Sequence, residues 1–200
     1  IYMIKYLSKY KQKMNPFIVF IGYFIVTHCA SADWNFFRGS ADMRGVAKHS
    51  LQLPLKLAWD IKIGRSVFAT PVVAGDKIFV GNEEGKFVSM DLKTGKILWE
   101  FDTEDIIEGT ACIAGSYVIF GSGDGFLYCM NQSDGKLKWK YETDGEILGG
   151  VNLFKSKEDN KLYVLAGSYD NYMHCVSLDN GKLKWKYETQ NYVNGAPGIA

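Results

Sequence analysis

Five carboxylates are the side chains of this sequence with the clearest capacity for chemistry. Glu83, Glu84, Glu104, Asp105 and Glu108 lie within a short stretch of the chain. Paired carboxylates can act as a general acid and a general base, and grouped ones can hold calcium. All five fall in turns between apolar segments, where solvated acids are normal. The pattern therefore favours surface turns, and any function of these acids depends on the elements that bring them together.

The other groups that could do chemistry form no known constellation. His49 and His174 lack the spacing to cysteine of a zinc site. The sequence contains no G-x-S-x-G nucleophile motif and no arrangement of Ser, His and Asp that suggests a triad. The glycine-rich stretch 121–125 precedes a strand-like segment, so it predicts a hairpin turn instead of a phosphate loop at a helix start. We therefore expect no catalytic residue, no metal ligand and no cofactor, and we expect His174 to be a satisfied strand histidine.

Composition narrows the class of protein. Apolar residues make up 47% and charged residues 22%, which excludes a disordered chain. Lys and Arg number 23 against 22 Asp and Glu, and a net charge of +1 argues against binding to nucleic acid. Glycine, at 21 of 200 residues, and 14% aromatic residues are typical of a turn-rich β protein.

The first 32 residues have the pattern of an export signal. They contain four lysines and no acid, then the apolar run 17–26, then Ala30-Ser31-Ala32. The run is shorter than the roughly 20 apolar residues of a membrane-spanning helix. We expect a signal peptide over 1–32 and an exported protein, in the periplasm, at the outer membrane or outside the cell. An uncut anchor and a lipid anchor at Cys29 are the alternatives, and either would be the only contact with a membrane.

An internal repeat determines the expected architecture. Tryptophans recur at intervals of 40, 40 and 46 residues: Trp59, Trp99, Trp139 and Trp185. A glycine stands four residues before each of the last three: Gly95, Gly135 and Gly181. Residues 135–143 recur without change as 181–189. The longer third interval contains the charged segment 155–160, which is expected to be a surface hairpin extension.

Each unit reads as four short strands separated by turns. Units of forty-odd residues with four strands each are typical of a β-propeller, and the long amphipathic helices of a helical solenoid are missing from the sequence. We expect an all-β propeller of four-stranded antiparallel blades, incomplete in this chain. The expected divisions are a lead-in over 33–54, a closing strand over 55–63, blades over 67–103, 109–143 and 147–189, and the start of another blade over 193–200. The three cysteines after the signal have apolar, strand-like neighbours and are expected to be buried: Cys112, Cys129 and Cys175.

Asp91 to Trp99 reads D-x-x-T-G-K-x-x-W. It resembles the tryptophan-docking motif of quinoprotein-type propellers and the PQQ-like repeats of the BamB family. The opening W-N-F-F-R-G of residues 34–39, followed by Gly45, is similar to the start of secreted bacterial PQQ-like propeller proteins. The resemblance implies that the repeat tryptophans pack between neighbouring blades and that the repeat glycines permit a tight turn. It also implies a ring of seven or eight blades, closed by an N-terminal strand, in a longer protein.

The later copies of this motif depart from it. Asn131 and Ser177 replace its Asp, and Asp134 and Asn180 replace its Thr, which argues against a ligand site repeated in every blade.

Three functions remain open from the sequence. The first is an exported, non-enzymatic scaffold that binds protein partners in the cell envelope, with Glu104, Asp105 and Glu108 on its binding face. The second is a dehydrogenase with pyrroloquinoline quinone (PQQ) and calcium on the propeller axis, which the resemblance also allows. The third is the sensor part of a larger multidomain protein.

Overall fold

The computed structural model of the protein describes residues 33–47 and 53–199. The signal peptide expected over 1–32, with Cys29, and also His49, lie outside the described residues. None of the helices in the described ranges is long and apolar enough to cross a membrane.

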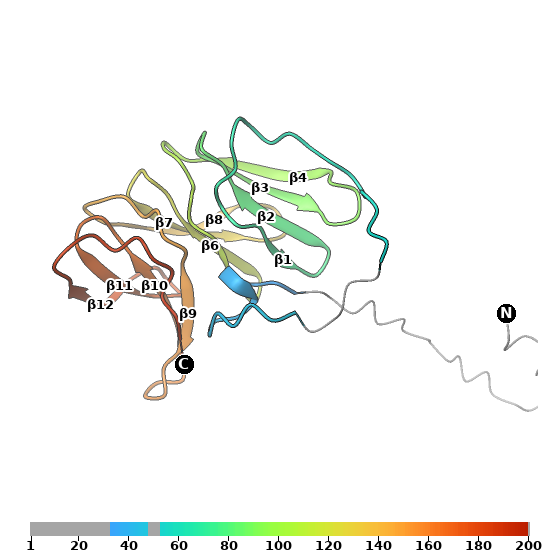
Figure 1. Cartoon of the computed structure of the whole chain (residues 1–200). Helices are drawn as coiled ribbons and strands as arrows, with labels where there is room; N and C mark the ends of the chain where they lie inside the picture. Colours follow the sequence, from blue (N-terminus) through green and yellow to red (C-terminus); the bar gives the residue numbers. More distant parts are fainter. Residues whose placement is uncertain (1–32, 48–52, 200) are drawn as a thin grey trace, which may run out of the picture. The chain divides into compact units, whose positions relative to one another are not determined.

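Three separate four-stranded antiparallel sheets make up the fold (Figure 1). The first contains β1 (Val72–Ala74), β2 (Lys77–Gly81), β3 (Lys86–Asp91) and β4 (Ile97–Asp102). The second contains β5 (Cys112–Ala114), β6 (Tyr117–Gly121), β7 (Phe126–Asn131) and β8 (Leu137–Glu142). The third contains β9 (Asn152–Lys155), β10 (Leu162–Gly167), β11 (Tyr172–Ser177) and β12 (Leu183–Glu188). Within each sheet, every strand pairs with the next one in the chain, so the predicted all-β propeller blades are confirmed.

The hydrophobic core lies between neighbouring sheets. Strand side chains point alternately to the two faces of a sheet. In β6, Val118 and Phe120 therefore join a cluster with residues of the first sheet, such as Phe79 and Phe87. Ile119 between them joins the cluster shared with the third sheet. Strands β5, β6 and β7 are buried on both faces in this way, which explains why they read as nearly continuous apolar runs, whereas the outer strand β8 is largely exposed.

The outer face of the third sheet has no fourth sheet against it in the described residues. Trp185 is 41% exposed, whereas Trp139, at the matching position of the second sheet, is 8% exposed. Residues 193–199 follow β12 and form no strand of their own. The three sheets do not close into a ring, as an incomplete propeller requires.

Two segments precede the first sheet. The lead-in, residues 33–47 (blue in Figure 1), contains the short 3-10 helix η2 (Phe37–Gly39) and contacts the inner strands β1 and β5. Residues 55–63 form no strand in the structure. Their assignment as a closing strand therefore stays a prediction.

Candidate functional site

The antiparallel order places the links between strands at two opposite ends of the sheets. One end, called here the connection end, carries the links within each sheet between its second and third strands and the links between sheets. These links are residues 82–85, 103–111, 122–125, 143–151 and 168–171. They contact one another, since the amide of Gly123 donates to the carbonyl of Ile106 and the amide of Tyr169 donates to that of Glu146. Their side chains therefore share one surface.

The connection end is acidic. Its five links contain nine carboxylates and neither lysine nor arginine: Glu83, Glu84, Glu104, Asp105, Glu108, Asp124, Asp144, Glu146 and Asp170. The links at the opposite end, called here the turn end, contain six lysines and five carboxylates. The two ends therefore differ in charge although the chain as a whole is nearly neutral.

Most carboxylates of the connection end lack a countercharge. Glu84 lies 3.5 Å from the Arg65 guanidinium. Glu104, Asp105, Glu108, Asp144 and Glu146 form no ion pair with any described residue. At the turn end, by contrast, Asp76 and Asp134 each pair with a neighbouring lysine at about 3 Å. The unpaired charge of the connection end is thus available to another molecule.

The predicted binding-face residues take different positions on this surface. Glu104 and Asp105 are exposed, and Glu108 is half-buried. The segment that carries them is fixed by Thr103, whose hydroxyl oxygen lies 2.8 Å from the Gly85 carbonyl oxygen and 2.7 Å from that of Asp105. Thr143 repeats both contacts in the next unit. These threonine clamps hold the acidic links on the rigid blades, which makes the surface preorganised.

A shallow hollow of about 200 Å³ opens at the connection end, where the inner strands converge. Phe68, Glu108, Leu148 and Asn194 contribute to it from four successive units, and Phe37 of the lead-in completes it. Phe68 is 64% exposed and Phe37 36% exposed, so the hollow presents aromatic surface beside a carboxylate. Polar side chains, among them Thr70, Thr110 and Asn194, complete the lining. Aromatic side chains are enriched at protein-binding surfaces, where they are combined with polar groups.

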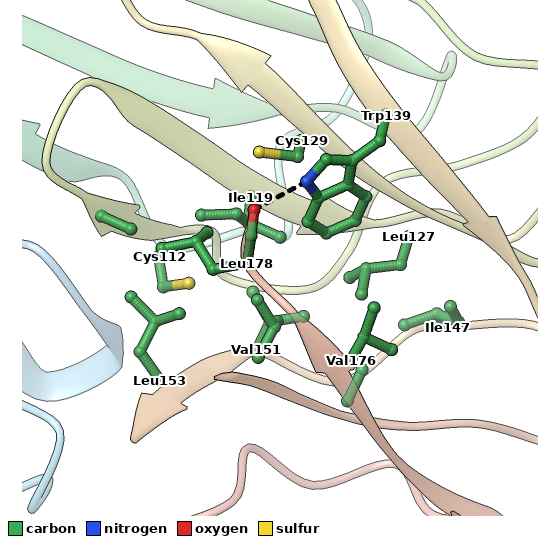
Figure 2. Packing of buried hydrophobic residues seen from close by; sticks show 13 residues of the cluster. Cys112, Ile119, Leu127, Cys129, Trp139, Ile147, Val151, Leu153, Val176 and Leu178 are labelled. Carbon is green, nitrogen blue, oxygen red and sulfur yellow. Dashed lines mark hydrogen bonds between the residues drawn. The ribbon is translucent and has the colours of Figure 1, made fainter. Parts of the chain in front are cut away.

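The repeat motif is a joint between neighbouring sheets (Figure 2). The indole nitrogen of Trp139 donates to the carbonyl of Leu178 at 2.8 Å, and its ring lies against Gly181. Trp99 contacts the second sheet in the same way, with its indole nitrogen 2.9 Å from the Gln132 carbonyl oxygen and its ring against Gly135.

Trp59 makes the corresponding contact with the first sheet, at the Leu92 carbonyl and Gly95. A Cβ at any of these three glycines would lie within 2.8 Å of the indole ring. Each glycine also has a φ near +70°, so both space and backbone conformation require glycine there. Trp185 makes no such contact in the described residues.

Asp91 serves the turn that presents Gly95. Its carboxylate accepts hydrogen bonds from the amide and hydroxyl of Thr94, and these bonds lower the pKa of the Asp91 carboxyl. Asn131 of the second sheet accepts hydrogen bonds from the amide and hydroxyl of Ser133, one position earlier in the turn than Thr94. An uncharged oxygen therefore replaces the carboxylate in this role, which explains how the motif changes between units without loss of the turn.

His174 is buried between the second and third sheets with both ring nitrogens paired. Nε2 lies 3.0 Å from the Asp170 carboxylate, and Nδ1 lies 3.0 Å from the Tyr141 hydroxyl. Burial alone would raise the pKa of Asp170, but the bond from His174 and the backbone amides of Tyr172 and Asp144 outweigh it, so this pKa is lowered. In the preceding unit Tyr128 donates to Asp124 at the same four-residue spacing. The arrangement matches the expected satisfied histidine and joins two sheets.

Part of the acidic surface was not predicted from the sequence. Asp124, Asp144, Glu146 and Asp170 lie in later links and were not grouped with the five carboxylates of the first units. Their common signal is the position in the repeat, since each falls in a link of the same end. In the described residues no group of three or more His, Cys, Asp or Glu side chains could hold a metal ion.

The comparisons with known proteins agree on the fold. The structure of BamB from Moraxella catarrhalis matches with a TM-score of 0.55 and 21% identity, over 66% of this chain and 39% of that one. The quinohemoprotein alcohol dehydrogenase from Comamonas testosteroni matches with a TM-score of 0.66 and 22% identity, over 78% of this chain and 27% of that one. A europium-containing methanol dehydrogenase matches with a TM-score of 0.66 and 17% identity, over 80% and 32%. No curated protein matches.

This chain thus spans well under half the length of each of these proteins, and at such identities the likeness concerns the fold alone. The family described as outer membrane protein assembly factor BamB matches over residues 55–197, which is most of the chain and includes all three sheets. The chain therefore belongs to the BamB family of PQQ-like β-propeller repeat proteins.

Proposed function

We propose that this chain is part of an exported, non-catalytic propeller whose connection end binds a protein partner in the cell envelope. The observation that carries the proposal is the charge of that end, with nine carboxylates and neither lysine nor arginine in its links. The family description, an outer membrane protein assembly factor, supports an envelope location and protein partners.

The charge also defines the partner. Opposite charges steer two proteins together and suppress wrong pairs, because like charges that meet at an interface are costly. The partner should therefore present lysines and arginines around an apolar or aromatic side chain that enters the hollow beside Phe68. Anionic molecules such as nucleic acids would be repelled by the same surface.

The test compares two variants with equal changes in charge. The first carries Glu104→Gln, Asp105→Asn and Glu108→Gln at the connection end. The control carries Asp134→Asn, Glu158→Gln and Asp179→Asn at the turn end. Each protein is cross-linked in envelope extracts, and the captured proteins are identified.

We expect the unmodified protein and the control to capture the same partner, with a yield that falls as salt increases, and the first variant to lose it. Equal capture by both variants would contradict the role of the connection end.

A second candidate is a PQQ-dependent dehydrogenase, favoured by the likeness to two dehydrogenase structures. The resemblance implies a cofactor on the propeller axis, and the hollow at the connection end is the candidate position for it. PQQ is an anion with several carboxylates, whereas the one charged residue among the described residues that line the hollow is Glu108. These residues do not fit the cofactor. Turnover of an alcohol by the full-length protein with added PQQ and calcium would favour the dehydrogenase and refute the scaffold.

A further inference from the structure

The lead-in makes an unusual set of contacts for a segment that precedes the blades in sequence. The backbone of Trp34 exchanges two hydrogen bonds of 2.9 Å with Val73 in β1. The carbonyl of Asn35 accepts from the amide of Ile113 in β5 at 2.9 Å. One short peptide thus contacts the first strands of two sheets.

The contacts continue to the third and fourth units. The carbonyl of Ala41 accepts from the side-chain amide of Asn152 in β9 at 2.9 Å and from the backbone amide of Ile199 at 3.0 Å. Asn152 is only 2% exposed, and its amide also donates to the Pro197 carbonyl at 2.7 Å. These bonds connect the lead-in to residues more than 100 positions later in the chain.

The inner strands need such a partner. β1, β5 and β9 each stand at the edge of their sheet, with one side paired to the following strand. The other side of an edge strand leaves amide and carbonyl groups unpaired, and a peptide can bind there. In the structure these groups of Val73 and Ile113 bond to the lead-in, so a peptide already occupies part of the inner edges, which are together called here the groove.

Side chains of the lead-in make further packing contacts beside the backbone hydrogen bonds. Phe36 packs against the hydrophobic cluster shared by the second and third sheets. The chain then turns at Gly39, whose φ of +85° lets it approach the Trp34 ring so closely that a Cβ would lie 2.8 Å from the indole. Phe37 reaches the hollow at the connection end and lies among its lining residues.

We propose that residues 33–47 are an intramolecular ligand of the propeller axis. They occupy the groove along the inner strands and close it to other peptides and ligands. The hollow beside Phe37 is then the part of the axis that stays open to a second molecule. This inference is independent of the partner proposed above, since it concerns the inner edges of the sheets and not the charge of the connection end.

The first experiment supplies the segment as a separate molecule. A labelled peptide of residues 33–47 is titrated into the full chain and into a chain that lacks residues 1–47, with fluorescence anisotropy as the readout. We expect binding to the shortened chain and none to the full chain, in which the groove is filled. The same peptide with Trp34→Ala and Phe36→Ala should bind at least tenfold more weakly.

The second experiment uses the full chain, in case the shortened one does not fold. Hydrogen exchange is measured for peptides that cover residues 33–47 in the unmodified protein, in Asn152→Ala and in the control Asn131→Ala. We expect slow exchange in the unmodified protein and the control, and exchange at least tenfold faster in Asn152→Ala. Exchange of the unmodified lead-in at the rate of an unfolded peptide would overturn the proposal, as would equal binding of the peptide to a folded shortened chain and to the full chain.

Discussion

The joint between neighbouring sheets allows a quantitative test at two glycines of the second sheet. Gly135 has a φ of +67° and lies against the Trp99 indole, and a Cβ there would be 2.6 Å from the ring. Gly115 has a φ of +58°, and a Cβ there would meet nothing within 4 Å. Alanine at either position therefore has the same backbone strain, and only at Gly135 does it also collide with the tryptophan.

The expected magnitudes follow from this difference. A left-handed conformation costs a residue with a Cβ roughly 1–2 kcal/mol. At Gly135 the indole must also move, which weakens the 2.9 Å bond from its nitrogen to the Gln132 carbonyl. Overpacking costs about 1–3 kcal/mol and a lost hydrogen bond about 1 kcal/mol. We expect the free energy of unfolding to fall by about 1–2 kcal/mol for Gly115→Ala and by about 3–5 kcal/mol for Gly135→Ala.

Urea unfolding monitored by circular dichroism measures both changes, and a double-mutant cycle with Trp99→Leu assigns the cause. Without the indole, Gly135→Ala should cost no more than Gly115→Ala, because only the backbone strain remains. Equal costs for the two alanine variants in the unmodified background would refute the steric argument. The steric argument would also be refuted if Gly135→Ala lowered the free energy of unfolding by the same amount in the Trp99→Leu background as in the unmodified protein.

Three further outcomes are expected from the described contacts. Trp139→Phe should lower the free energy of unfolding by at least about 1 kcal/mol, because it removes the bond to the Leu178 carbonyl, whereas Trp185→Phe should have little effect in this chain. Burial raises the pKa of Cys129 to about 12 and that of Cys175 to about 11, so these thiols should resist a thiol reagent until the protein unfolds. The stability that the protonated thiols contribute should be lost as the pH rises towards those values. The pKa of Asp170 is lowered in the folded protein, so the stability that its carboxylate contributes is present above the ordinary carboxyl pKa and is lost as the pH falls through the lowered pKa. Asp170→Asn should therefore destabilise the protein at pH 7 and much less in strong acid. Thermal unfolding at the two pH values measures the difference.

The blades could be predicted from the sequence because their signals are local and repeated. Alternation along each strand and the regular tryptophan spacing indicate where the strands lie. The glycine at the end of each turn indicates where the turns lie. In the second unit Asn131 stands where the motif of the first unit has Asp91. In the structure both residues supply one acceptor oxygen to the same turn, so the chemistry that the turn needs is conserved although the charge is not.

The lead-in and the acidic surface could not be predicted in the same way. The bonds of Ala41 to Asn152 and Ile199 join residues far apart in the chain, and they use backbone groups that every residue has. No residue type marks such a contact in a sequence. The carboxylates of the connection end were visible one by one, but their common surface depends on the direction of each strand. Glu104 and Glu146 fall in the same part of the repeat, and the strand order of the structure shows that this part lies at one end of the sheets.

The two proposals are connected by the lead-in, which runs from the turn end to the hollow at the connection end. The lead-in begins at the turn end, where the Asp33 carboxylate accepts from the amide of Gly75 at 2.9 Å, and Phe37 reaches the hollow beside Glu108 at the connection end. An attachment placed before Asp33 would therefore leave the acidic surface free for a partner, and capture experiments should immobilise the protein there. Because Phe37 belongs to both regions, the two proposals must be separated by charge. Neutralising Glu108 and its neighbours should abolish partner capture without changing hydrogen exchange in the lead-in, whereas Asn152→Ala should loosen the lead-in and leave every carboxylate of the connection end in place.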